Sequence, residues 1–252
     1  MCLKRRAILV ACDPNNKLHS ITDDLGNWYC SLQEPYLGGW DCFEMTILSY
    51  DEATITKLRE EIKNADDNED YLLFIFSGHG RMQWKQSAEQ TIIQLMDGVI
   101  EENELYNLDS RCQRKTIFFD CCRNNVELPH VIRRLAARIT IKDVAQFMYL
   151  WLLSISAPGI VRMYSSQKGE VAQDSPSFTK RFFESTQKMI HYIKREKYIC
   201  YSTYDVFRET AKMFLTQNIQ HPEYSTIYGG HQFPFIINPF IQIEDLLKRI
   251  HF

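Results

Sequence analysis

Two short apolar segments in the middle of the chain each lead directly into chemically reactive residues. Residues 71–76 run into Ser77-Gly78-His79-Gly80, and residues 115–119 run into Asp120-Cys121-Cys122-Arg123. Short runs of β-branched and aromatic residues are typical of buried parallel strands. In an open parallel sheet the functional groups lie beyond the carboxyl ends of the strands. If these two strands are neighbours, His79 and Cys122 emerge side by side at one edge of the sheet.

A thiol beside an imidazole is the minimum set of groups for a cysteine nucleophile, because the thiolate attacks and a nearby base generates it. His79 would then serve as base and acid, and the backbone N–H groups of Gly80 and Cys122 would face a developing oxyanion. Gly78 and Gly80 flank the histidine, which predicts a turn or a close approach of backbone there. The alternative is structural, since a lone histidine or buried cysteine at a strand end is common.

Composition excludes several classes of protein. The chain has 252 residues, a net charge of −3 and a pI near 6.2, which gives no electrostatic basis for binding nucleic acid or an anionic membrane. The apolar start at residues 7–12 is too short for a signal peptide and is expected to be a strand. Residues 144–157 are also too short for the roughly 18–20 residues of a membrane span, so a buried helix is expected there.

The eight cysteines show no metal-binding spacing, and only Cys121 and Cys122 are adjacent. Without a secretory signal, a reduced, cytoplasmic setting is expected rather than a disulfide framework. The sequence therefore predicts no metal and no other cofactor.

Strand-like and helix-like segments alternate along the chain. This alternation predicts a mostly parallel sheet with helices on both faces. Thr22 is expected to cap the first helix, and Asp97-Gly98 to close a hairpin after residues 90–95. The expected strands are 5–12, 43–48, 71–76, 115–119, 160–164 and 232–237, and the expected helices are 22–32, 53–65, 101–108, 128–154, 178–192, 203–215 and 241–250.

The two motifs resemble the histidine and cysteine motifs of the caspase–metacaspase superfamily. On either pattern the nucleophile is Cys122 rather than Cys121. Arg123 is caspase-like, whereas Asp120 is metacaspase-like. The sequence departs from both patterns at Asn124-Asn125, where the family has a small residue and a glycine.

The resemblance extends over about residues 7–238. It includes the first strand and helix, residues 163–180, and the segment from His221 to Phe235. It implies the caspase–hemoglobinase fold, with a mostly parallel six-stranded sheet sandwiched by helices. The chain would be a single peptidase domain, 1–252. A large-subunit-like half at about 5–128 would precede a helical linker region at 129–158 and a small-subunit-like half at 159–252.

The resemblance also implies the substrate specificity. In the family, the positions of Asp24, Ser77 and Asp120 line the S1 pocket, which receives the P1 side chain. Two carboxylates there imply cleavage after arginine or lysine, because a guanidinium is held by charge-assisted hydrogen bonds. The alternative for Asp24 is an acidic residue that stabilises a helix N-terminus.

The predictions about how the enzyme is activated rest on the resemblance alone. Arg133, Arg134 and Arg138 lie where the family often has its processing linker, so an arginine-specific enzyme could cleave itself there; a basic helix face is the alternative. Calcium activates many metacaspases, but Asp97 is an isolated candidate ligand, so no calcium site is predicted. Compact relatives imply an activating protein partner and a role in bacterial defence or cell death, with a pore-forming or toxic effector as the substrate.

Two other hypotheses compete with a peptidase. The first is an inactive caspase-like scaffold that binds peptides or partner proteins through the same groove; the intact pair of His79 and Cys122 argues against it. The second is a nucleotide-binding domain, which needs a glycine-rich turn after the first strand. Residues 13–17, Asp-Pro-Asn-Asn-Lys, supply no such turn.

Overall fold

A computed structural model of the protein describes residues 3–15, 18, 20–85, 88–106, 110–122, 139–170, 172, 177–196, 198–215, 220–227 and 233–241. The helices are α1 (Ile21–Leu32), α2 (Ile55–Asn68), α3 (Ile139–Ile155), α4 (Phe178–Glu196) and α5 (Thr203–Leu215). The strands are β1 (Arg5–Cys12), β2 (Met45–Ser49), β3 (Tyr71–Lys85), β4 (Ala88–Leu95), β5 (Gly98–Glu101), β6 (Arg114–Cys122), β7 (Gly159–Tyr164), β8 (Cys200–Ser202), β9 (Glu223–Ile227) and β10 (Pro234–Ile237).

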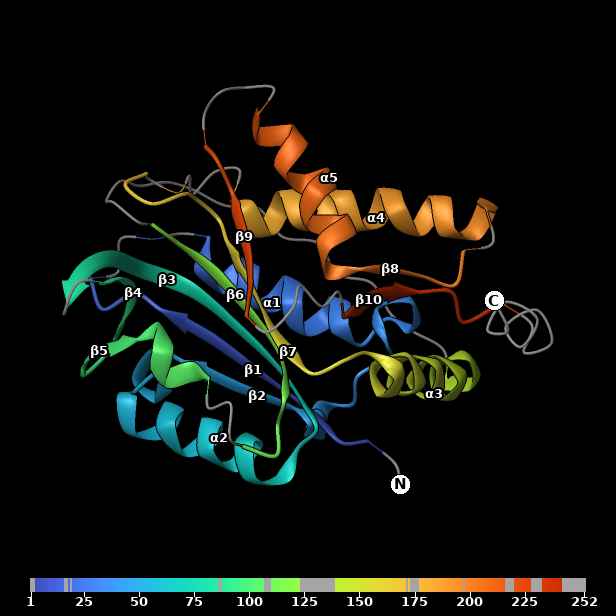
Figure 1. Ribbon diagram of the computed structural model, residues 1–252, viewed down its shortest axis with the longest axis horizontal. Helices are drawn as coiled ribbons and strands as arrows, with labels where there is room; N and C mark the ends of the chain where they lie inside the picture. The colour runs from blue at the N-terminus through green and yellow to red at the C-terminus, as the bar shows by residue number, and fades with distance from the viewer. Residues whose placement is uncertain are drawn as a thin grey trace.

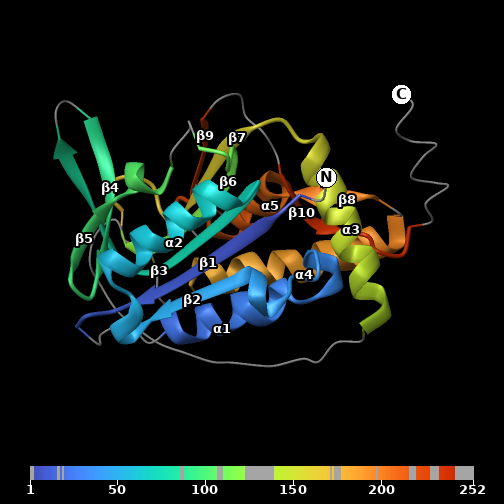
Figure 2. The same cartoon turned by 90° about the horizontal axis from the view of Figure 1, so that it is seen from below.

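The central sheet has the strand order β2-β1-β3-β6-β7-β9. Its first five strands run parallel, and β9 pairs antiparallel with β7 at the edge. This arrangement confirms the predicted mostly parallel six-stranded core. β4 and β5 extend the sheet from β3 to eight strands and stand at one end of it (Figure 2).

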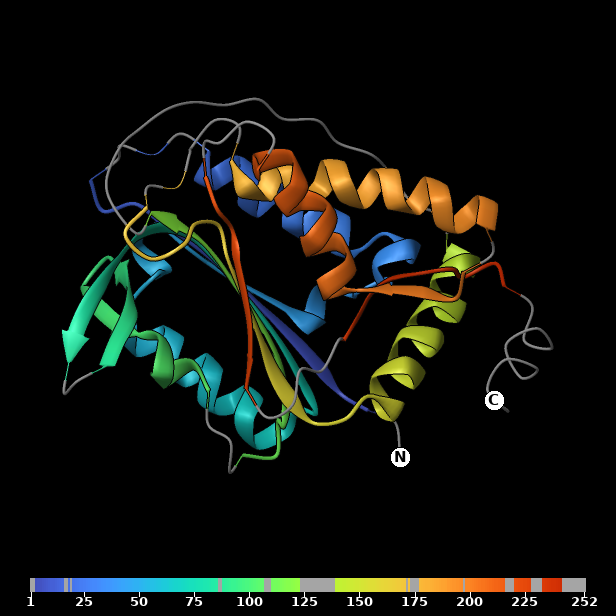
Figure 3. The same ribbon diagram turned by 45° about the horizontal axis from the view of Figure 1, so that its top comes forward.

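Helices cover both faces of the sheet. α2 lies on one face, and α1, α4 and α5 lie on the other (Figures 1 and 3). A hydrophobic core lies on each face of the sheet, and successive strand residues contribute to them alternately. Ile75 and Phe118 pack toward α1 and α4, whereas Phe74 and Phe119 pack toward α2. Trp28 of α1 meets Phe118 edge-on, with 4.9 Å between ring centroids. Because both faces are buried, the central strands are almost continuously apolar.

β3 is longer than the sequence predicted. The strand was expected to end at residue 76, but it continues through His79 to Lys85 and changes partners on the way. Up to His79 it pairs in parallel with β6, and from Gly80 it pairs antiparallel with β4. The predicted turn around His79 is therefore wrong. The histidine lies within a strand, at the point where that strand leaves the central sheet.

The glycines beside His79 allow close approach of neighbouring backbone. A Cβ atom on Gly78 would collide with the carbonyl oxygen of Cys12 on β1. A Cβ on Gly80 would lie 2.5 Å from the Cys121 sulfur on β6. Glycine at these two positions therefore keeps β3 in register with both neighbours.

We expect Gly78→Ala to lower the free energy of unfolding by about 2–3 kcal/mol, because a backbone carbonyl is in the way and cannot move aside cheaply. Gly26→Ala is the matched control: Gly26 lies in α1 with nothing within 4 Å of an added Cβ. Alanine there should stabilise the fold by about 0.5–1 kcal/mol. Urea unfolding of both variants measures the difference, and equal stabilities would contradict the close-approach argument.

Two predictions about the early helices need correction. Thr22 does not cap α1: the helix begins at Ile21 with Ser20 as the N-cap residue, so Thr22 lies inside it. The helix expected over residues 101–108 is a short 3₁₀ turn at Glu102–Leu105. Residues 107–109, which follow this turn, lie outside the described part of the chain.

α3 is amphipathic rather than buried all round. Ala145, Met148 and Leu153 are buried, but Phe147 is 64% exposed and Ile155 is 61% exposed. The helix predicted from the apolar run at residues 144–157 is therefore present, but one of its sides faces solvent. The predicted helical residues 128–138 lie outside the described part of the chain.

The C-terminal part contains two strands that the sequence did not predict, β8 and β9, and one that it did, β10, within the strand expected at 232–237. β8 and β10 form a separate two-stranded antiparallel sheet, and β9 is the antiparallel edge strand of the main sheet. The strand expected at 232–237 is described from Pro234, and the helix expected at 241–250 lies almost wholly outside the described residues.

Candidate active site

Three neighbouring strands bring the candidate residues to one edge of the sheet. In the β3–β6 ladder, Ser77 pairs with Asp120, and His79 pairs with Cys122. In the β1–β3 ladder, Ala11 pairs with Ser77. The structure therefore brings His79 and the backbone of Cys122 together as register partners, at the carboxyl ends of parallel strands.

Positions 121 and 122 of β6 fall on opposite faces of the sheet. Cys121 is buried in the core on the α2 side, together with Phe119. Because side chains alternate along a strand, position 122 falls on the α1 and α4 side, which it shares with Asp120 and His79. The Cys122 side chain lies outside the described part. Backbone register alone therefore favours position 122 over position 121 as the partner of His79.

Cys12 also lies near this edge, at the end of β1, but it is poorly suited to attack. Its side chain is fully buried. Burial, together with the negative charges of Asp13 and Asp97, raises the pKa of the Cys12 thiol to about 12. A thiol with that pKa stays protonated near neutral pH and is a weak nucleophile.

His79 is hydrogen-bonded to a carboxylate that the sequence analysis did not single out. Its Nε2 atom lies 2.9 Å from Oδ1 of Asp13, the first residue after β1. The side chain of Asp13 is only 4% exposed, and that of His79 is 16% exposed. Asp13 could have been noticed because it follows the first strand directly, as His79 and Cys122 follow the other apolar runs.

Asp13 is held by the loop that follows it. The backbone amide of Leu18 donates to Oδ2, and the amide of Asn15 donates to Oδ1 at 3.1 Å. Burial favours the neutral acid, but the hydrogen bonds from Leu18, His79 and Asn15 outweigh it and hold the pKa of Asp13 below its ordinary value. At neutral pH Asp13 is therefore a carboxylate that faces the His79 ring.

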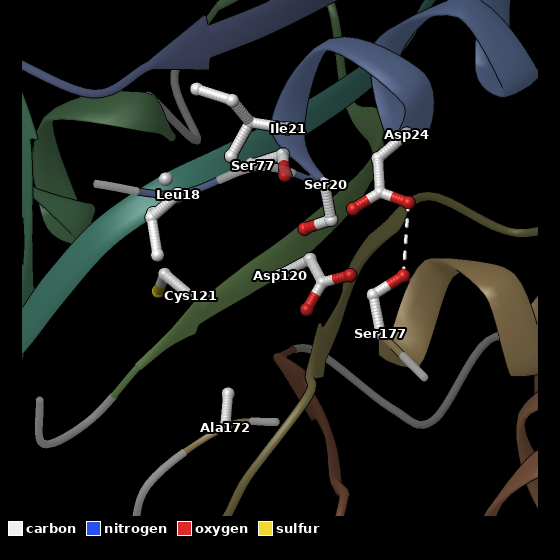
Figure 4. A pocket seen from close by; sticks show the side chains of 10 residues that line it. Leu18, Ser20, Ile21, Asp24, Ser77, Asp120, Cys121, Ala172 and Ser177 are labelled. Carbon is white, nitrogen blue, oxygen red and sulfur yellow. Dashed lines mark hydrogen bonds between the residues drawn. The ribbon is translucent and has the colours of Figure 1, made fainter. Parts of the chain in front are cut away.

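A small cavity that is open to solvent lies beside this row of residues (Figure 4). The predicted S1 residues Asp24, Ser77 and Asp120 all line it, although they come from α1, β3 and β6. The other described lining residues are Leu18, Ser20, Ile21, Gly78, Cys121, Ala172 and Ser177. The described lining residues include two carboxylates, those of Asp24 and Asp120, and no basic side chain.

The start of α4 supports both carboxylates. Ser177, which precedes the helix, donates its hydroxyl to Oδ1 of Asp24 at 2.9 Å, and the backbone amide of Thr179 donates to Oδ2 of Asp120 at 2.8 Å. Asp24 is 2% exposed and Asp120 is 7% exposed. The alternative that Asp24 only stabilises the N-terminus of α1 is incomplete, because its carboxylate also points into the cavity (Figure 4).

A second histidine–carboxylate pair holds the loop after β7. Glu170 accepts hydrogen bonds from the backbone amide of His221, at 2.9 Å, and from its ring Nδ1 atom, at 2.5 Å. Burial raises the pKa of Glu170, but the bonds from His221 outweigh it and hold that pKa below its ordinary value. The pair ties the loop that leads to Ala172, on the cavity wall, to the segment before β9.

Several predicted features lie elsewhere or outside the described residues. Arg133, Arg134 and Arg138 fall in the part that is not described. Asp97 accepts a hydrogen bond from the backbone amide of Ile55 and so supports the start of α2. Within the described ranges there is no cluster of three or more possible metal ligands. None of the helices described there is long and apolar enough to cross a membrane.

Comparison with protein families identifies the class. Residues 4–234 match the caspase domain, Peptidase_C14. Because this match covers most of the sequence, the chain belongs to the caspase family, as the two motifs predicted. No curated protein matches the sequence significantly.

Solved structures show the same fold at low sequence identity. Protein GSU0716 from Geobacter sulfurreducens is 18% identical, with a TM-score of 0.59 over 90% of this chain and 94% of that one. Caspase-1 from Spodoptera frugiperda is 12% identical, with a TM-score of 0.52 over 88% and 89% of the two chains. The Drosophila initiator caspase Dronc is 13% identical, with a TM-score of 0.50 over 89% and 80%. The α/β caspase fold, predicted from the sequence, is confirmed.

Proposed function

We propose that this chain is a cysteine endopeptidase that cleaves protein substrates after arginine or lysine, with Cys122 as nucleophile and His79 as its base and acid. The observation that carries the specificity is the cavity beside His79, lined by the carboxylates of Asp24 and Asp120 and by the hydroxyl of Ser77. Membership of the caspase family supports the reaction class.

The proposed reaction begins when His79 takes the proton of the Cys122 thiol. The thiolate attacks the carbonyl carbon of the P1 residue, and the backbone N–H groups of Gly80 and Cys122 stabilise the oxyanion. His79 then returns its proton to the leaving amine. Water hydrolyses the thioester with the same ring acting as base, which restores the thiol.

Charge explains the proposed preference for a basic P1 residue. A guanidinium or ammonium group entering the cavity would meet two buried carboxylates that the start of α4 already holds in place. Preorganised acceptors bind a cation without further ordering cost, and arginine offers a planar set of donors for them. An aspartate at P1 would instead place a third negative charge among these groups.

The proposal is tested with three fluorogenic peptides that are identical except for arginine, lysine or aspartate at P1. We expect kcat/KM for the arginine and lysine peptides to exceed that for the aspartate peptide by at least about 10²-fold. Preference for the aspartate peptide would overturn the assigned specificity. Lack of cleavage of every peptide, with binding of a P1-arginine peptide retained, would favour the inactive scaffold.

Activation by a protein partner, self-cleavage at Arg133, Arg134 or Arg138, and a role in defence or cell death remain predictions from the family resemblance. Incubation of the purified chain, followed by mass spectrometry, tests the self-cleavage: new C-termini at these arginines would support it, and an intact chain under conditions that cleave the arginine peptide would contradict it.

A further inference from the structure

Asp13 and Cys122 stand on opposite sides of His79 at this edge of the sheet. β1, β3 and β6 are adjacent, and the β1–β3 ladder ends at Cys12 and Gly78. One residue further along these strands stand Asp13 and His79, and the register partner of His79 on β6 is Cys122. The three residues thus follow one another across the sheet edge, and His79 is in the middle.

We propose that Asp13 is a positioning residue for His79 and completes a Cys122–His79–Asp13 triad. This inference rests on the proposed function, because it assigns Asp13 a part in the same reaction. Asp13 would not touch the substrate. It would act only through the orientation and charge of the imidazole ring.

The hydrogen bond between His79 and Asp13 determines which ring nitrogen of His79 accepts the proton of the thiol. Asp13 is ionised at neutral pH and can only accept, so Nε2 of His79 must carry the proton of this bond. In the neutral ring the lone pair is then on Nδ1, which becomes the atom that takes the proton from Cys122 and later gives it to the leaving amine. When the ring gains its positive charge, the buried carboxylate stabilises it.

The surroundings of Asp13 make it a rigid support. The amides of Asn15 and Leu18 fix both carboxylate oxygens, and Leu18 is also part of the cavity wall. Among the described residues, the titratable groups that face this carboxylate are His79 and the Cys12 thiol. Asp97 is close enough to Cys12 to raise the pKa of the Cys12 thiol. Of these groups only His79 shares a hydrogen bond with Asp13.

A purely structural role is the competing explanation, because Asp13 also holds its own loop. The two roles differ in what they change. Loss of a loop support would lower stability and weaken substrate binding through Leu18. Loss of a positioning residue would lower kcat and the reactivity of Cys122 while KM and the unfolding temperature changed little.

The first test reads the His79 ring directly and needs no substrate. In protein labelled with ¹⁵N-histidine, the Nε2–H proton of His79, assigned with His79→Gln, should be shifted downfield and protected from exchange. Asp13→Asn should abolish this signature, and Asp13→Glu should retain it at least in part. Absence of the signature in the wild-type protein would overturn the proposal, even if Asp13→Asn failed to fold.

The second test measures reactivity. Iodoacetamide alkylation of Cys122, followed by peptide mass spectrometry, should slow about tenfold in Asp13→Asn, whereas the exposed Cys30 and Cys42 serve as internal controls with unchanged rates. With the arginine peptide, kcat should fall about a hundredfold and KM should stay within about twofold. Asp13→Glu should recover part of the loss.

Asp41→Asn is the matched control. Asp41 lies at the opposite end of the sheet, before β2, where its carboxylate bonds Lys142 and Gln146. Neutralising it should leave kcat and the alkylation of Cys122 unchanged. If Asp13→Asn behaves like Asp41→Asn, the positioning role is wrong and the peptidase proposal stands. If no peptide is cleaved but alkylation of Cys122 still depends on Asp13, the positioning role holds and the proposed function fails.

Discussion

Cys122→Ala is expected to reduce hydrolysis of the P1-arginine peptide to background, a loss on the order of 10⁴-fold or more in kcat, whereas Cys121→Ala retains most of the activity. The reason is the alternation of the β6 strand. Position 122 is the register partner of His79, whereas Cys121 packs in the core on the α2 side and only borders the cavity. Steady-state kinetics with the same peptide measures both variants.

The pair of variants is well matched, because each removes one thiol from adjacent positions of the same strand. Cys121→Ala creates a small void against Gly80, so its unfolding temperature is recorded beside the kinetics. Alkylation of Cys122 in the Cys121→Ala protein shows that the remaining thiol is intact. Full activity of Cys122→Ala, or loss of activity in a folded Cys121→Ala, would show that the nucleophile was assigned to the wrong residue.

Much of the candidate active site could be predicted from the sequence, because buried parallel strands have a recognisable, continuously apolar sequence. The apolar runs before Ser77 and Asp120 are continuous, since helices cover both faces of the sheet. Their ends therefore marked the positions of His79 and Cys122, and the structure confirms that these positions pair in register. Asp24 came only from the family resemblance, because no local pattern connects α1 to the ends of β3 and β6.

The continuation of β3 beyond His79 was missed for a physical reason. After Gly80 the strand pairs antiparallel with β4, and residues 81–83 are at least partly exposed. The sequence from 81 to 85, Arg-Met-Gln-Trp-Lys, therefore lacks the uniform apolar character of the core. Glycine on both sides of a histidine also favours a turn when only the sequence is considered. Here both glycines serve close packing of neighbouring strands, which only the assembled sheet reveals.

The contact between Asp13 and His79 was equally hidden. Asp13 sits in a segment rich in turn-forming residues, where an aspartate that bonds its own backbone is common. It does make such bonds, with the amides of Asn15 and Leu18. Its bond to His79 depends on the adjacency of β1 and β3 and on the length of β3. Long-range hydrogen bonds of this kind follow from the register of the sheet and not from any local pattern.

Neutralising the cavity carboxylates is expected to have the second largest effect. Asp24→Asn and Asp120→Asn should each lower kcat/KM for the arginine peptide by about 10²–10³-fold, because each leaves a buried cation with one carboxylate fewer. Asparagine is chosen because its side-chain oxygen still accepts the hydrogen bonds from Ser177 and from the Thr179 amide. The start of α4 should therefore stay in place, and the loss should reflect charge alone.

Asp23→Asn is the matched control for the first variant, since Asp23 is the preceding residue of α1, is also buried, and is not among the residues that line the cavity. It should leave kcat/KM for the arginine peptide almost unchanged. The double variant Asp24→Asn/Asp120→Asn should lose the preference for arginine over an uncharged P1 residue such as glutamine altogether. Because the two carboxylates share one ligand, their effects should not add. Undiminished cleavage after arginine by the double variant would place the P1 side chain outside this cavity.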